Sequence, residues 1–296
     1  MDALLTIPRE ATPAVVFLRS EIPPDHPSSA ILGQERLGTG VAVAEDRILT
    51  AHYLVMGARR VEVTGFDGRE REVRRTTVDH TTGLALVTVD GPLLRPARIE
   101  EEHEPRPGLP IFLLTCTREG ERKSTTGHVS AIGPFEAFWE YMLDKAIMTT
   151  AINPGLAGAP LFDLEGRLLG LVSLGLAAVG RYSLAIPVRL YLDRRAAMEA
   201  EAGPRSGRAW VGFFPQAFDG GVIVTGVVEG GPADKAGVAR GDLVLSLDGQ
   251  SVSNLRELYT ALWRKIPGEV VGLQILRDSA IRVVEITAGD RDEFYK

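Results

Sequence analysis

The chain has 296 residues, a formal net charge of −6, and a composition that is 45% hydrophobic and 24% charged. This length allows about two domains with a substantial core. Because the net charge is negative and both signs are interspersed, the sequence argues against nucleic acid or an anionic membrane surface as the main partner. The one cysteine, Cys116, excludes an intrachain disulfide and a zinc site made of cysteines, and we expect no metal and no cofactor.

The N-terminal residues carry no localisation signal that can be read from composition. They have no basic region followed by an apolar stretch, as a signal peptide would. No window approaches the roughly 20 apolar residues of a membrane span. If Met1 is the natural start, we expect a cytoplasmic protein; if a signal segment was removed, we expect a periplasmic or secreted one.

Residues 10–202 read as an all-β domain that ends in one helix. Short segments rich in Val, Ile and Leu are separated by Gly, Pro and Asp turns. The helix is predicted at 188–202, with Val188, Leu192 and Ala196 on one face, before the helix-ending Gly203-Pro204. The predicted strands are 14–19, 39–44, 60–65, 84–89, 111–115, 126–132, 145–149, 167–173 and 182–186.

A linker at 203–207 leads to a second, α+β domain at 208–290. Asn254 is a suitable N-cap for a helix that carries Leu258 and Leu262 on one face. The predicted elements are strands at 221–228, 243–247, 270–276 and 281–287, a helical turn at 231–237 and a helix at 254–265.

Three segments, in order, resemble the motifs around the catalytic residues of HtrA-type, trypsin-like serine proteases. They are residues 38–55, which include His52, residues 78–87, and residues 151–161. The C-terminal unit, beginning at Trp210-Val211-Gly212-Phe213, is similar to the PDZ domain of the same family. The resemblance implies a mainly β fold, in which a chymotrypsin-like double β-barrel is followed by a small α+β PDZ domain.

Carried over residue by residue, the resemblance places the triad at His52, Gly83 and Ala157. The mechanism needs a hydroxyl nucleophile, an imidazole base and a carboxylate that fixes the imidazole tautomer. Glycine and alanine supply neither of the missing groups, so no catalytic site is expected to be intact. Leu156 and Ala159 also depart from the family's Asn and Gly, which favours natural degeneration over a single engineered change.

Other residues near the motif are weaker candidates for chemistry. Asp79 and His80 precede Gly83 closely enough to approach His52, but a turn role is predicted for Asp79. The backbone N–H groups of Gly155 and Ala157 could still form an oxyanion-hole-like nest, although Ala159 replaces a glycine beside it. Nothing in the sequence places Ser130 or Ser173 beside His52, and His103 and His128 lack metal-ligand spacing.

The PDZ resemblance implies a peptide-binding groove. Such domains add the ligand as a strand and receive its C-terminal carboxylate on backbone amides. The implied peptide-binding residues are Trp210, Val211, Gly212, Phe213, Leu258 and Leu262. The alternative is that these apolar residues only fill the core of the small domain.

The sequence therefore predicts a pseudoprotease that binds peptides or protein segments and acts as a scaffold, regulator or chaperone-like protein. Expected ligands are C-terminal peptides with an apolar last residue, bound in the PDZ groove or the former substrate cleft. Association into a homo-oligomer or with an active paralogue stays open. Two alternatives remain: an active serine-type endopeptidase with a rearranged site, and a structural subunit of a larger assembly.

Overall fold

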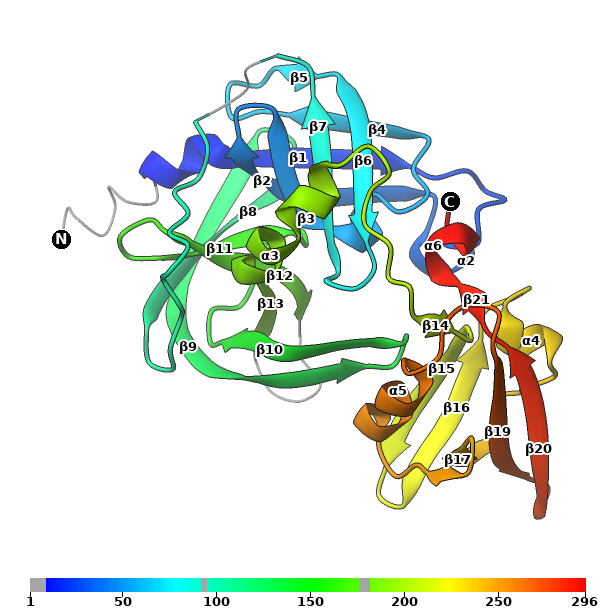
Figure 1. Cartoon of the computed structure of the whole chain (residues 1–296). Helices are drawn as coiled ribbons and strands as arrows, with labels where there is room; N and C mark the ends of the chain where they lie inside the picture. The colour runs from blue at the N-terminus through cyan, green and yellow to red at the C-terminus, as the bar shows by residue number, and fades with distance from the viewer. Residues whose placement is uncertain (1–8, 92–94, 176–181) are drawn as a thin grey trace. The chain divides into compact units, whose positions relative to one another are not determined.

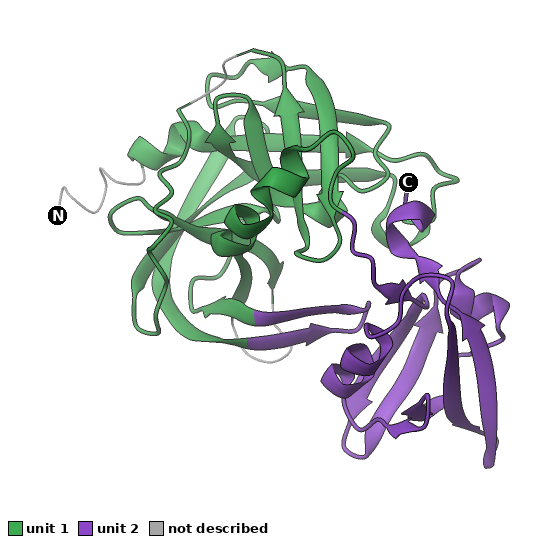
Figure 2. Ribbon diagram, viewed as in Figure 1, with its two compact units in different colours: residues 1–133, 145–204 green, residues 134–144, 205–296 purple. Residues whose placement is uncertain are grey.

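The computed structural model describes residues 9–91, 95–175 and 182–296. It divides into two compact units, which Figure 2 colours separately. Unit 1 consists of residues 1–133 and 145–204, and unit 2 of residues 134–144 and 205–296. The tip of one hairpin, residues 134–144, therefore belongs to unit 2 although the chain on both sides of it belongs to unit 1.

The first half of unit 1 is a seven-stranded sheet in the order β5-β4-β1-β2-β3-β7-β6. Alternating apolar residues of these strands bury one face, and Val16, Leu18, Ile48, Ala85 and Val87 are in its core. The elements are η1 (Thr12–Ala14), β1 (Val15–Glu21), α2 (Ser29–Leu32), β2 (Glu35–Ala44), β3 (Arg47–Ala51), η2 (His52–Leu54), β4 (Arg60–Thr64), β5 (Glu70–Arg71), β6 (Val73–Asp79) and β7 (Leu84–Val89).

The second half of unit 1 is a closed barrel in the order β10-β13-β12-β11-β8-β9 (Figure 1). Its core contains Ile111, Leu113, Ile147, Leu161 and Val172. The strands are β8 (Pro110–Arg118), β9 (Glu121–Ala137), β10 (Tyr141–Thr149), β11 (Ala159–Asp163), β12 (Leu168–Gly175) and β13 (Ser183–Pro187). The mainly β class expected from the sequence is confirmed; of the two expected barrels, the second half of unit 1 is a closed barrel and the first half is a seven-stranded sheet.

Helix α3 (Val188–Glu199) begins directly after β13, with Pro187 as its N-cap residue. Its buried residues are Val188, Tyr191 and Met198. The predicted face was wrong at Ala196, which is exposed, because the buried stripe passes through the larger Tyr191 and Met198 instead.

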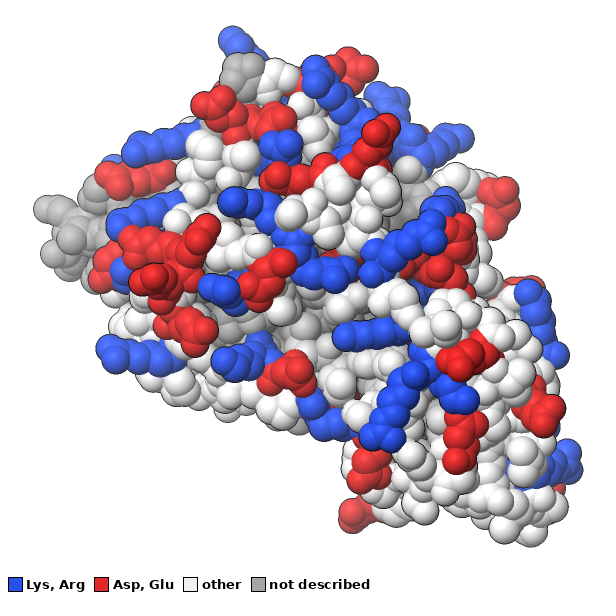
Figure 3. Space-filling view, in the orientation of Figure 1, with Lys and Arg blue, Asp and Glu red and all other residues white. Residues whose placement is uncertain are grey.

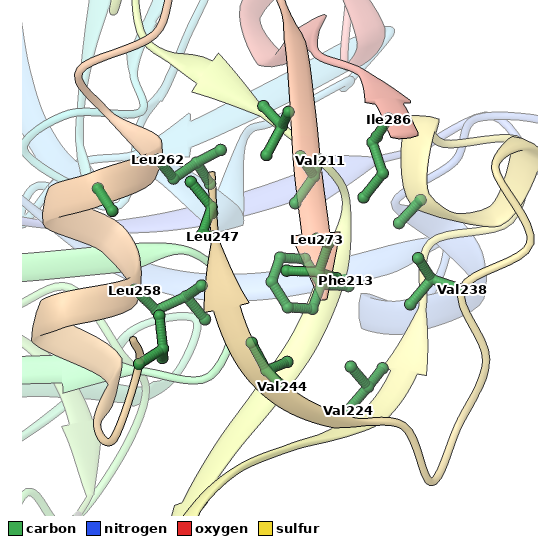
Figure 4. Packing of buried hydrophobic residues seen from close by; sticks show 14 of the residues in the cluster. Val211, Phe213, Val224, Val238, Val244, Leu247, Leu258, Leu262, Leu273 and Ile286 are labelled. Atoms are coloured by element: carbon green, nitrogen blue, oxygen red, sulfur yellow. The ribbon is translucent and has the colours of Figure 1, made fainter. Parts of the chain in front are cut away.

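Unit 2 has a sheet in the order β15-β16-β17-β19-β20, with β18 paired to β17, and a separate pair β14-β21. Figure 4 shows its core, in which Val211, Phe213, Leu258 and Leu262 all point into one cluster. The elements are β14 (Ala209–Trp210), β15 (Phe213–Phe218), β16 (Gly221–Val227), α4 (Pro232–Lys235), β17 (Leu243–Leu247), β18 (Gln250–Ser251), α5 (Leu255–Leu262), β19 (Val270–Arg277), β20 (Ala280–Thr287), β21 (Gly289–Asp290) and α6 (Arg291–Phe294).

Lys and Arg side chains alternate with Asp and Glu over the face drawn in Figure 3. This agrees with the interspersed charges of the sequence. No helix among the residues that the structure describes is long and apolar enough to cross a membrane.

Candidate functional site

His52 lies at the end of β3, as the first residue of η2, and is only 6% exposed. Its Nδ1 atom is 3.0 Å from the carbonyl oxygen of Gly83, and its backbone N–H donates to the same oxygen at 2.9 Å. Because a carbonyl oxygen only accepts, this geometry requires the proton on Nδ1. The ring of His80 meets that of His52 edge-on, with centroids 5.5 Å apart.

Gly83 holds His52 with its backbone rather than with a side chain. It sits in a turn closed by its own N–H donating to the carbonyl of Asp79 at 2.9 Å, and its φ of 77° favours glycine. The neutral carbonyl can fix the tautomer of His52, as the triad carboxylate does. It brings no negative charge to stabilise an imidazolium, which the reaction requires.

The nearby carboxylate of Asp79 is committed to other partners. Asp79 is 1% exposed, and its carboxylate accepts from Nε of Arg194 on α3 at 3.0 Å and from the N–H of Thr81 at 3.0 Å. These bonds give Asp79 the turn role predicted from the sequence, with an additional ion pair that the sequence did not reveal.

The other polar candidates lie on other elements of unit 1 or pair with other residues. Ser173 lies on β12, where its carbonyl accepts from the hydroxyl of Tyr53 at 2.6 Å, and Ser130 is exposed on β9. His103 pairs with Asp163 at 3.0 Å, and His128 is exposed on β9. Within the described ranges, no group of three His, Cys, Asp or Glu residues could hold a metal ion.

The loop before β11 is fixed by its own bonds and by β2 and β8. The carbonyl of Ala157 accepts from the N–H of Thr39 at 2.8 Å, and the N–H of Leu156 donates to Cys116 at 2.9 Å. The N–H of Gly155, one of the two expected oxyanion-hole donors, donates to Oδ1 of Asn153 at 3.2 Å. Position 157 presents a methyl group and no nucleophile.

The expected difficulty at Ala159 does not arise. Ala159 is the first residue of β11 and is not among the described residues with positive φ. The left-handed conformation falls one residue earlier, on Gly158, with a φ of 83°. The backbone of Gly158 also approaches Thr39 and Thr50 so closely that a Cβ would lie 2.0 Å from the Thr39 carbonyl oxygen.

The predicted peptide-binding residues of unit 2 have different surroundings. Val211 and Gly212 connect β14 to β15, Phe213 begins β15, and the side chains of Val211 and Phe213 are buried in the core cluster. Trp210 instead is 4% exposed and packs its ring on Phe294 and Tyr295, with centroids 4.6 and 5.7 Å away. Leu258 and Leu262 are fully buried in the core cluster.

The sequence analysis missed Glu140, at the tip of the β9–β10 hairpin. Its carboxylate accepts from the N–H groups of Val211 at 3.2 Å, Gly212 at 2.6 Å and Phe213 at 3.2 Å. Glu140 itself is 4% exposed. In the sequence, Glu140 is an acidic residue inside the aromatic run 138–141, and nothing in that pattern indicates its partners.

Burial raises the pKa of the Glu140 carboxyl to about 7, although the amide hydrogen bonds and Arg291 act in the opposite direction. Tyr259 and Tyr295 are the other titratable groups that interact with it. A carboxyl with a raised pKa in the folded state stabilises that state at low pH, and this contribution is lost as the pH rises through the folded pKa.

We therefore expect Glu140 to make unit 2 about 2 kcal/mol less stable at pH 8 than at pH 5. Urea unfolding at both pH values, followed by tryptophan fluorescence, measures this difference. The Glu140→Gln variant is neutral at both pH values and should lack it. An equal pH dependence in the two proteins would contradict the assignment.

Both parts of the chain match known protein families. Residues 38–171 match the trypsin-like peptidase domain family, and residues 199–288 match the PDZ domain family. The chain is 29% identical over 273 residues to a protein from Halomonas elongata that is described as a probable periplasmic serine endoprotease, DegP-like. The matched segment covers 86% of this chain and 56% of that protein. A protein of the same description from Ectopseudomonas mendocina is 28% identical over 298 residues, covering 94% and 62%.

Solved structures agree with these sequence matches. The HtrA-type protease AlgW with a decapeptide has a TM-score of 0.57 and 25% identity, covering 97% of this chain and 98% of that one. A serine endoprotease from Yersinia pestis has a TM-score of 0.59 at 24% identity, covering 97% of each chain, and supports the fold alone.

Two facts limit what the sequence relatives imply. The chain spans 56% and 62% of the length of the two curated relatives described above. Those relatives are described as periplasmic, which overturns the cytoplasmic placement expected from the N-terminal residues. That expectation failed because it depended on Met1 being the natural start, which a sequence alone does not establish.

Proposed function

Because this chain is a homologue of the DegP/HtrA-type proteins, with a trypsin-like peptidase domain followed by a PDZ domain, we propose that it binds peptides in the periplasm without cutting them. One observation carries the proposal. The positions that should supply the nucleophile and the carboxylate beside His52 hold the methyl group of Ala157 and the backbone of Gly83.

The size of the catalytic loss supports an inactive protein. Removing a triad nucleophile lowers turnover by about a million-fold, and other triad losses add little to that. Binding and an oxyanion hole alone leave roughly a thousand-fold acceleration over water. The Gly155 N–H already donates to Asn153, which weakens even that contribution.

Peptide binding is the activity that these losses leave in place. PDZ domains bind an extended peptide through backbone amides and an apolar pocket, and neither depends on a catalytic residue. The related AlgW structure contains a decapeptide. We propose C-terminal peptides with an apolar last residue as ligands, and a scaffold, regulatory or chaperone-like role.

The proposal is tested by incubating the full chain with unfolded casein and with a fluorophosphonate that labels activated serines. We expect neither cleavage nor labelling, while an array of decapeptides with free carboxylate ends shows binding. Cleavage that disappears in His52→Ala would overturn the proposal in favour of a rearranged active site. Absence of both binding and cleavage would favour the structural-subunit alternative.

A further inference from the structure

The tip of the β9–β10 hairpin is bound within unit 2 by hydrogen bonds on both sides. The carbonyl of Ala137 accepts from the hydroxyl of Tyr259 on α5, and that hydroxyl accepts from the N–H of Glu140 at 3.2 Å. The carbonyl of Glu140 accepts from Arg291 at 3.1 Å. The backbone of the tip is thus held from α5 and from α6, while the Glu140 side chain reaches the loop before β15.

Ion pairs and an apolar contact extend this attachment. Arg256 on α5 donates to Glu136 at 2.6 Å and to Asp144 at 2.9 Å, one on each strand of the hairpin. Met142, next to the tip, packs against the core cluster that contains Leu258 and Leu262. The segment therefore brings one buried carboxylate and one apolar side chain to the predicted peptide-binding residues.

The backbone of Glu140 indicates that its side chain is what this position requires. Its φ is 54°, in the left-handed region that favours glycine or asparagine over a long side chain. A glycine would make the turn without strain. A strained residue that persists because its side chain is bound is typical of a binding or switching site.

We propose that the β9–β10 hairpin is an internal ligand of the PDZ groove, in which the Glu140 carboxylate occupies the amide loop that a peptide C-terminus would use. The inference deepens the proposed function and rests on it for the identity of the external ligand. Three N–H groups that already donate to one carboxylate cannot bind a second one at the same place. A peptide with an apolar last residue must therefore displace the hairpin tip.

Because the hairpin is tethered, its effective concentration at the groove is on the order of millimolar or higher. Free peptides must compete with this tethered hairpin. Their apparent affinity is the intrinsic affinity multiplied by the fraction of molecules in which the groove is empty. Binding is therefore selective for peptides that supply both a carboxylate and an apolar side chain.

The test compares the full-length wild type with Glu140→Gly, which removes the carboxylate and relieves the left-handed strain. Glu140→Gln is the second variant, and Glu229→Gln is the matched control because Glu229 is an exposed acid of the same unit. Two quantities are measured: amide hydrogen exchange at residues 211–213, and binding of a free-carboxylate decapeptide array alongside its amidated counterpart.

We expect Glu140→Gly to raise exchange at residues 211–213 and to tighten binding of free-carboxylate peptides at least tenfold, with a smaller effect in Glu140→Gln and none in Glu229→Gln. Unchanged exchange in both Glu140 variants would overturn the inference, and so would equal peptide affinity in wild type and Glu140→Gly. If no protein binds any peptide while exchange rises in Glu140→Gly, the proposed function fails but the internal ligand is supported.

Discussion

Gly158→Ala should lower the free energy of unfolding of unit 1 by about 4 kcal/mol. Alanine at a φ of 83° carries left-handed strain of about 1 to 2 kcal/mol. Its Cβ would also lie 2.0 Å from the carbonyl oxygen of Thr39 and 2.7 Å from Oγ1 of Thr50, so the loop or β2 must shift. Such a shift would break the Thr39–Ala157 hydrogen bond that fixes the loop before β11.

The three tryptophans of the chain, at positions 139, 210 and 263, all lie in unit 2. Hydrogen exchange of unit 1 peptides in urea therefore measures the loss, and tryptophan fluorescence reports unit 2 separately. Gly133→Ala is the control, because Gly133 has no atom within 4 Å of its added Cβ and no positive φ. A loss in Gly158→Ala no larger than in this control would contradict the prediction.

Arg194→Met should lower the free energy of unfolding of unit 1 by about 3 kcal/mol, because it leaves the carboxylate of Asp79 buried without its ion-pair partner. Arg194 is about one third exposed, so the loss falls at the lower end of the range for buried pairs. Methionine keeps most of the apolar stem of the arginine, and the change therefore removes mainly the guanidinium.

Arg195→Met is the matched control on the same helix, since Arg195 is exposed. Unfolding of the two variants is compared by hydrogen exchange of the 79–83 turn in urea. Equal stability of the two variants would mean that Thr81 and solvent suffice for Asp79. Casein cleavage by Arg194→Met would contradict the proposed function, because position 157 supplies no nucleophile for His52 to activate.

The all-β and α+β classes of the two domains were predictable because their signals are local, whereas the double β-barrel and PDZ architecture came from the resemblance to HtrA-type proteases. Period-two apolar segments separated by turn residues located most strands, and Asn254 does cap α5, accepting from the N–H of Glu257 at 2.9 Å. Two-residue strands such as β5 and β14 were missed, because two residues carry no periodicity, and the longer strands β6 and β11 were not predicted either. The face of α3 was misjudged because spacing alone does not say which of two neighbouring stripes carries the larger buried side chains.

The candidate site was predictable only where one motif carried it. His52, Gly83 and Ala157 each follow from a short segment of sequence. Glu140 could not be found this way, because its role depends on contacts with residues 71 to 73 positions away. The residues of the Asp79–Arg194 pair are 115 positions apart in the sequence, so this pair could not be predicted for the same reason.

For the inactive protein proposed above, the Gly83 turn also makes a route to proteolysis by substitution a long one. The backbone carbonyl orients His52 whatever the residue's chemistry, so long as the chain keeps a φ near 77°. An aspartate restored at this position would have to adopt that same left-handed conformation and then displace the carbonyl from the imidazole. A serine restored at position 157 alone would meet a histidine with no carboxylate behind it, so single reversions bring little gain on which selection could act.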